Sequence, residues 1–195
     1  MKKNIVILAL VLAAVVVVVL TNNNGNSSAG TQENSPEASY EDVQGVNGDI
    51  SKAPKQGAIA PGFTLASLDG TSEFKVGGKR DKVLIINFWA AWCGPCELEA
   101  PDLVDIYDKH KDKVDLYAVN VTKFDKLREA KDFVKEQGFK MPVLTDDKGE
   151  AGDLYKVFSY PTSFIVDRNG VILQRIEGVI DREQWETYLE QAIAS

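Results

Sequence analysis

The strongest constraint on the fold is a nearly continuous apolar run, "KVLIINFWA", at residues 82–90. Such a run is typical of a strand that is buried on both faces, at the centre of a covered sheet. The next segment, from Cys93 to about Lys113, has the pattern of a helix. Its apolar stripe consists of Leu98, Leu103, Ile106 and Tyr107. The sequence therefore predicts a central strand that leads almost directly into a helix.

Strands and helices alternate along the rest of the chain. Two short strands around an Asp69-Gly70 turn precede the central strand, and a hairpin with an Asn169-Gly170 turn comes later. The predicted order is β-β-β-α-β-α-β-α-β-β-α, which indicates an α/β fold whose sheet is partly antiparallel. The remaining predicted elements are a strand at 114–121, a helix at 124–138, a short strand at 141–146, a brief helix at Asp153–Phe158, two strands within 162–178 and a helix at 181–194 that opens with an Asp181 cap.

Residues 1–20 are expected to lie outside this fold, as a signal-anchor or a signal peptide. Ile5–Leu20 is an uninterrupted run of sixteen apolar residues after two lysines. As a helix it is about 24 Å long, shorter than the ~30 Å hydrocarbon core but longer than a typical signal-peptide core of ~7–15 residues. We weigh these lengths in favour of a retained single-pass anchor, with secretion after cleavage as the alternative. The lysines predict that the rest of the chain is extracytoplasmic, at the cell membrane.

Residues 21–57 form a predicted flexible polar linker, and residues 58–195 a predicted domain. The linker is rich in Asn, Ser, Gly, Glu and Gln, without large apolar clusters or periodicity, as is typical of a solvated tether. The whole chain carries a net charge of −7. Because nucleic-acid binding needs clustered Lys and Arg, no nucleic-acid partner is expected.

The two cysteines of the chain, Cys93 and Cys96, lie at the predicted start of the helix after the central strand. A helix N-terminus offers free N–H groups and a partial positive charge, which stabilise the thiolate that attacks a disulfide. Cys96 is placed to displace a partner from Cys93 after a mixed disulfide has formed. Pro95 is tolerated in a first helical turn, and Gly94 leaves the first sulfur uncrowded. This pattern favours a redox pair.

Two other uses of these cysteines fit the sequence less well. A closed zinc site takes about four ligands. The only histidine is His110, which we take to be a surface residue, so a carboxylate or another chain would have to complete the site. A structural disulfide across two residues would close a loop too short to stabilise much. No metal and no cofactor are therefore expected.

The segment "NFWAAWCGPCELEAPDL" resembles the active-site segment of thioredoxin-fold proteins. It is most similar to that of the TlpA/ResA-like group of membrane-anchored thiol-disulfide oxidoreductases. The similarity extends through "APGFTLASLDG", "FVKEQGFKMPVLTD" and "YPTSFIVDRNG", and covers about residues 58–195. It implies a thioredoxin fold: a mixed central sheet flanked by helices, with an added N-terminal β-hairpin and a helical insertion.

The resemblance also implies a substrate-binding surface around the cysteine pair. Pro161 matches the cis-proline of the family, which leaves the backbone of Tyr160 free to pair with an extended substrate chain. Trp92 is expected to form the rim that meets partners, together with Gly94 and Pro95.

Glu99 matches an acidic residue that lies near the active-site cavity in this group. It comes three residues after Cys96, on the same helix face, and could carry protons to and from that cysteine. An exposed acid that is stabilised by the helix dipole is the alternative. Cytoplasmic thioredoxins have an aspartate where this chain has Asn87, and asparagine cannot ionise. Proton transfer is therefore expected of Glu99.

The function implied by the resemblance is an extracytoplasmic thiol-disulfide oxidoreductase that reduces exported proteins, such as apocytochrome c, through Cys93 and Cys96. Its electrons are expected from a transmembrane thiol relay, because reducing pools such as glutathione are cytoplasmic. One alternative is a peroxiredoxin-like thiol peroxidase, which would have Thr or Ser in place of Ala90. Another is a non-enzymatic binding module on a thioredoxin fold, which would usually have lost a cysteine or the downstream proline.

Overall fold

The apolar run at residues 82–90 forms strand β3, Val83–Trp89, whose seven residues are all buried. Our computed structural model describes residues 53–195. The predicted signal-anchor at 1–20, and the predicted linker up to residue 52, lie outside the described residues. The other elements are β1 (Phe63–Ala66), β2 (Glu73–Val76), α2 (Gly94–His110), β4 (Val114–Asn120), the 3₁₀ turn η3 (Thr122–Phe124), α3 (Leu127–Glu136), β5 (Val143–Thr145), α4 (Glu150–Tyr155), β6 (Thr162–Val166), β7 (Ile172–Glu177) and α5 (Arg182–Ala194).

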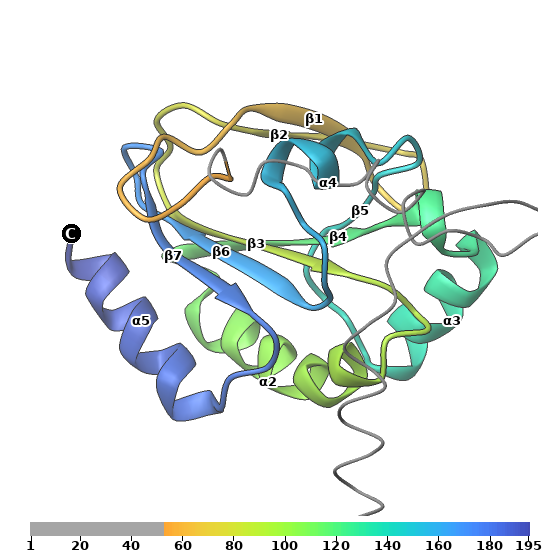
Figure 1. The fold of residues 1–195 in the computed structure, drawn as a ribbon. Helices are drawn as coiled ribbons and strands as arrows, with labels where there is room; N and C mark the ends of the chain where they lie inside the picture. The colour runs from red at the N-terminus through yellow and green to blue at the C-terminus, as the bar shows by residue number, and fades with distance from the viewer. Residues whose placement is uncertain (1–52) are drawn as a thin grey trace, which may run out of the picture. The chain divides into compact units, whose positions relative to one another are not determined.

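Strand β3 is the middle strand of a five-stranded sheet with the order β5-β4-β3-β6-β7 (Figure 1). β4 pairs in parallel with both β3 and β5, whereas β6 pairs antiparallel with both β3 and β7. β1 and β2 form a separate antiparallel hairpin. The predicted mixed sheet with an added N-terminal hairpin is thus confirmed. Between β4 and β6 the chain forms η3, α3, β5 and α4, and the helical insertion that the resemblance implied stays a prediction.

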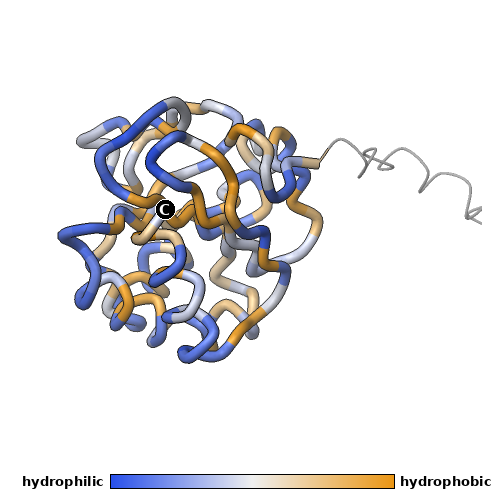
Figure 2. Tube along the Cα trace, turned by 90° about the vertical axis from the view of Figure 1, so that its left-hand side faces the viewer, coloured by the Kyte–Doolittle hydropathy of each residue, from blue (hydrophilic) through white to orange (hydrophobic). Residues whose placement is uncertain are grey.

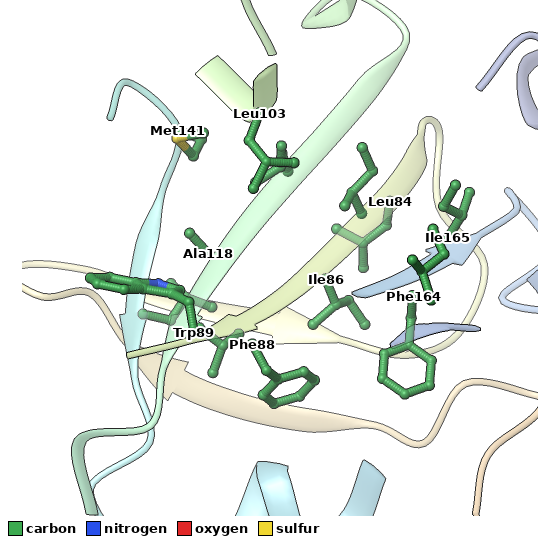
Figure 3. Close-up of a cluster of buried hydrophobic side chains, with 14 of the residues drawn as sticks. Leu84, Ile86, Phe88, Trp89, Leu103, Ala118, Met141, Phe164 and Ile165 are labelled. Carbon is green, nitrogen blue, oxygen red and sulfur yellow. The ribbon is translucent and has the colours of Figure 1, made fainter. Parts of the chain in front are cut away.

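The two faces of the sheet are covered differently. Helices α2 and α5 lie on one face, and the β1–β2 hairpin with α4 lies on the other (Figure 1). On the hairpin side, the ring centroid of Tyr155 is 5.6 Å from that of Phe88 and 4.8 Å from that of Phe164. Figure 3 shows Phe88 and Phe164 on the same side of the sheet. The Tyr155 hydroxyl donates to the Pro61 carbonyl at 2.8 Å. This aromatic cluster therefore joins the segment just before β1 to the sheet.

The helix side of the core is built from one face each of α2 and α5. In Figure 2 hydrophobic and hydrophilic stretches, in orange and blue, alternate along the turns of the chain. Leu103 of α2 and Trp185 of α5 are fully buried. Leu98, predicted in the same stripe as Leu103, is instead 75% exposed. The buried face of α2 follows Cys96, Glu99 and Leu103, and helical spacing turns residue 98 away from it. Among residues 53–195, no helix is both long and apolar enough to cross a membrane.

Two further local predictions are wrong. The brief helix predicted at Asp153–Phe158 is α4, which begins earlier, because Gly149 adopts a left-handed conformation and the Asp146 carboxylate accepts hydrogen bonds from the first turn. His110 is not a solvated surface residue. Its side chain is only 14% exposed, because α2 packs against α5, where its Nε2 lies 2.8 Å from Glu186 Oε2.

The two leucines of α2 allow a matched test of this packing. Leu103→Ala is expected to lower the free energy of unfolding by about 2–5 kcal/mol, because it removes a buried side chain and leaves a cavity. Leu98→Ala, on the exposed face of the same helix, should change it by less than about 0.5 kcal/mol. Denaturant unfolding measures both variants, and equal losses would contradict the burial described here.

Candidate active site

Cys93 and Cys96 are joined by a disulfide at the start of α2, with their Cα atoms 5.2 Å apart. Cys93 is the N-cap residue, with extended backbone, and its sulfur accepts a hydrogen bond from the Cys96 N–H at 3.1 Å. In the reduced protein, this N–H and the positive end of the helix dipole would both stabilise a thiolate at Cys93. The predicted position at a helix N-terminus is thus found.

A groove of about 350 Å³ opens beside the disulfide. Its walls include exposed aromatic side chains: Trp92 is 57% exposed and Phe158 is 51% exposed. The rings of Trp92 and Tyr160 meet edge to face, with centroids 5.7 Å apart. The lining residues are Trp92, Cys93, Gly94, Pro95, Phe158, Ser159 and Tyr160.

The groove therefore brings together most of the residues that the sequence predicted for substrate binding. Phe158 and Ser159 were missed, although their position just before Tyr160 could have indicated them. A larger groove of about 640 Å³ lies between the β1–β2 turn and α3, and it contains none of the predicted site residues. We place the active site at the smaller groove, because only that groove includes a reactive sulfur.

The Tyr160–Pro161 peptide bond is cis, as the resemblance implied. Strand β6 begins at the next residue and runs antiparallel to β3, with Thr162 opposite Phe88. This register carries the proline loop to the end of β3, where the chain turns toward the cysteines. Two segments far apart in the sequence thereby form the two sides of one groove.

Glu99 is buried, with 1% of its surface exposed, and is therefore not an exposed helix acid. Burial raises the pKa of its carboxyl to about 7. A hydrogen bond from Asn87 partly offsets this rise, and the charge of Asp102 adds to it. The carboxyl can thus gain or lose a proton near neutral pH, as a general acid or base requires.

Two strands and a helix position this carboxyl. Asn87 of β3 and Ser163 of β6 lie directly opposite each other. The Asn87 amide Nδ2 donates to Glu99 Oε2 at 3.0 Å and to Ser163 Oγ at 2.9 Å. Glu99 Oε1 has no hydrogen-bond partner among the described residues. Cys96 is buried on the same face of α2, one turn before Glu99. The Glu99 carboxyl, with this oxygen free, is therefore positioned to exchange a proton with the Cys96 thiol. Ser163 was not predicted.

Comparisons with known proteins agree with this geometry. The AhpC/TSA family matches residues 56–175. The thiol-disulfide oxidoreductase ResA of Bacillus thuringiensis subsp. konkukian is 37% identical over 136 residues, which are 69% of this chain and 77% of the relative. The thioredoxin-like protein YneN of Bacillus subtilis is 36% identical over 137 residues, which are 70% of this chain and 79% of the relative.

A solved structure supports the same relationship. The crystal structure of StoA from Bacillus subtilis aligns with a TM-score of 0.59 and 29% sequence identity. The alignment covers 67% of this chain and 98% of StoA. Together with the observed sheet order, this confirms the predicted thioredoxin fold.

Proposed function

Since the chain belongs to the AhpC/TSA family and is a thiol-disulfide oxidoreductase related to ResA, we propose that it reduces disulfides of exported proteins through Cys93 and Cys96. The observation that carries this proposal is the cysteine pair at the start of α2, in an aromatic groove beside the Tyr160–Pro161 turn. A reactive sulfur in a groove with apolar walls suits a polypeptide chain as substrate.

The reaction would proceed by two thiol-disulfide exchanges. The Cys93 thiolate attacks one sulfur of the substrate disulfide, and the other substrate sulfur leaves as a thiolate and takes a proton from solvent. Cys96 then transfers its proton to the Glu99 carboxylate, and its thiolate attacks Cys93 in the mixed disulfide. The second substrate sulfur leaves and is protonated in turn. The enzyme ends with the Cys93–Cys96 disulfide, and the substrate with two thiols.

The substrate we favour is apocytochrome c, whose haem-attachment motif has the form Cys-X-X-Cys-His. A short oxidised loop of this kind can lie extended along the groove, where the backbone of Tyr160 would pair with it. To test this, the reduced protein is mixed with an oxidised Cys-X-X-Cys-His peptide, and thiol release is compared with that from insulin. We expect the peptide to react faster. Equal rates would remove this substrate preference but not the reductase activity.

We further propose that the catalytic domain is extracytoplasmic, tethered by residues 1–20, and that a transmembrane thiol relay reduces it. The apolar run with its preceding lysines supports this placement. Protease added outside cells whose walls have been removed should digest the domain, and the protein should be recovered with membranes. Recovery from the medium would instead indicate cleavage of the segment, and protection from the protease would contradict the placement.

The two alternative functions are less well supported. Ala90, which is fully buried, has no hydroxyl to offer a peroxide, unlike the Thr or Ser expected in a thiol peroxidase. A binding module without activity does not fit relatives that are named as oxidoreductases. Peroxide consumption by the reduced protein, at a rate comparable with that of disulfide reduction, would revive the peroxidase.

A further inference from the structure

A short turn after β4 holds the segment that leads into the disulfide. It consists of the 3₁₀ turn η3, Thr122–Phe124, and its C-cap residue Asp125. We call these four residues together the η3 turn. The Asp125 carboxylate oxygen Oδ2 accepts a hydrogen bond from the backbone N–H of Ala91 at 2.6 Å. The Phe124 carbonyl accepts one from the indole Nε1 of Trp92 at 3.0 Å. Phe124 and Asp125 therefore each accept a hydrogen bond from the segment just before Cys93.

Asp125 is itself held by the central sheet. The amide Nδ2 of Asn120, a fully buried residue at the end of β4, donates to the same Oδ2 at 2.8 Å. The backbone N–H of Lys126 donates to the other oxygen at 2.8 Å. Asn120 lies opposite Trp89 in the parallel pairing of β3 and β4. The carboxylate thus links the end of β4 to the segment that carries Ala91 and Trp92, beside the groove.

The η3 turn also contacts the segment that leads to the other wall of the groove. The backbone N–H of Lys123 donates to the Asp146 carbonyl at 3.1 Å. The Lys123 ammonium lies 3.7 Å from a carboxylate oxygen of Asp153 in α4. The chain continues from α4 to Tyr160, whose ring meets that of Trp92. The turn therefore also contacts the segment that precedes the second wall of the groove.

We propose that Asp125 is a positioning residue for peptide substrates, which fixes the Trp92 wall against which an extended chain binds. The Cys93 sulfur is held by α2 itself, where it accepts a hydrogen bond from the Cys96 N–H as the N-cap, and Asp125 makes no hydrogen bond to Cys93. Loss of the Asp125 carboxylate should therefore weaken peptide binding and leave the reactivity of the sulfur intact. The part of this proposal that concerns substrates rests on the proposed function, whereas the part that concerns the position of Trp92 does not.

The test compares Asp125→Ala with Asp125→Asn. Alanine removes the partly buried hydrogen bonds from Ala91 and Asn120, and KM for insulin should rise about tenfold with little change in kcat. Asparagine can keep one oxygen in place for Ala91 and Asn120, so KM should stay within about twofold of wild type. Asp132→Ala is the control, because Asp132 is an exposed acid of α3 with no hydrogen bond or ion pair among those found in residues 53–195.

Hydroxyethyl disulfide is a small substrate without a peptide chain. Its reduction therefore reports the reactivity of the Cys93 sulfur and does not depend on how the Trp92 wall is positioned. Its reduction by Asp125→Ala should stay within about twofold of wild type, since the Cys93 cap is untouched. An equal loss with both substrates would overturn the proposal, as would an unchanged KM for insulin. A rise in KM for insulin that is as large in Asp125→Asn as in Asp125→Ala would also overturn the proposal.

A measurement without substrate keeps the proposal testable if insulin is not reduced at all. Trp92 is largely exposed, whereas Trp89 and Trp185 are buried, so acrylamide quenches mainly Trp92. Quenching should increase in Asp125→Ala and stay at the wild-type level in Asp132→Ala. No increase would overturn the proposal. If Asp125→Ala does not fold, Asn120→Ala, which removes one anchor of the same carboxylate, should increase quenching to a smaller extent, and no change would again contradict it.

Discussion

Cys93→Ser is expected to abolish disulfide reduction, with a loss of at least about 1,000-fold, because serine cannot form the attacking thiolate. Cys96→Ser should behave differently. Its Cys93 can still attack a substrate disulfide, but no second thiol is present to displace the partner. The variant should therefore accumulate mixed disulfides between the enzyme and its substrates, joined through Cys93.

Non-reducing gels followed by mass spectrometry distinguish the two cysteines. Cys96→Ser incubated with oxidised substrate should shift to the mass of the mixed disulfide, and a reductant should reverse the shift. Cys93→Ser is the matched control, since it retains a cysteine but loses the one at the helix cap. If both variants trap partners equally, the roles assigned to the two sulfurs are wrong.

Glu99→Gln should slow resolution of the mixed disulfide by about 100-fold, within the usual range for loss of a general base. The wild-type rate of this step should rise with pH through about 7, as the Glu99 carboxyl ionises and becomes able to accept the Cys96 proton. Glutamine keeps the shape and an oxygen for the Asn87 hydrogen bond but cannot titrate. In the variant, this inflection near pH 7 should be absent.

The same carboxyl should also make stability depend on pH. Its pKa is raised from 4.5 in the unfolded chain to about 7 in the folded protein, so the folded state holds this proton more tightly. The contribution of Glu99 to stability therefore falls as the pH rises from about 4.5 to about 7. Above that range Glu99→Gln should be the more stable protein, by up to about 3 kcal/mol, which is the energy equivalent of this pKa difference.

Stopped-flow kinetics and denaturant unfolding across this pH range test the two effects of Glu99 separately. Glu97→Gln is the matched control, because Glu97 is an exposed acid of the same helix turn. It should change neither the inflection nor the stability profile appreciably. An inflection near pH 7 that persists in Glu99→Gln would show that another group transfers the proton.

Much of the fold follows from local patterns in the sequence. The apolar run of β3, the turn residues of the two hairpins and the Asp181 cap of α5 each act within a few residues, and each was predicted. Asp181 indeed accepts a hydrogen bond from the N–H of Gln184. Leu98 shows the limit of this approach, because periodicity indicates that a helix has a buried face but leaves its edges uncertain.

The active site was harder to predict, because its contacts join distant segments. The spacing from Cys96 placed Glu99 on the right helix face but could not establish its burial. That burial depends on the sheet against which α2 packs. The Asn87 amide donates both to Glu99 and to Ser163, which lies 76 residues from Asn87 in the chain. The bond between Asp125 and Ala91 likewise spans 34 residues. No local pattern marks such pairs, although the family resemblance did locate Pro161.

The reduction potential of the Cys93–Cys96 couple tests the central claim most directly. It is measured by equilibrating the protein with defined ratios of oxidised and reduced dithiothreitol and quantifying its free thiols. A Gly-Pro pair between the cysteines, as in thioredoxin, predicts a reducing couple at about −270 mV. Such a value would support a reductase of exported proteins. A value above about −150 mV, near the oxidising end of the range for such proteins, would contradict that account and indicate an enzyme that forms disulfides.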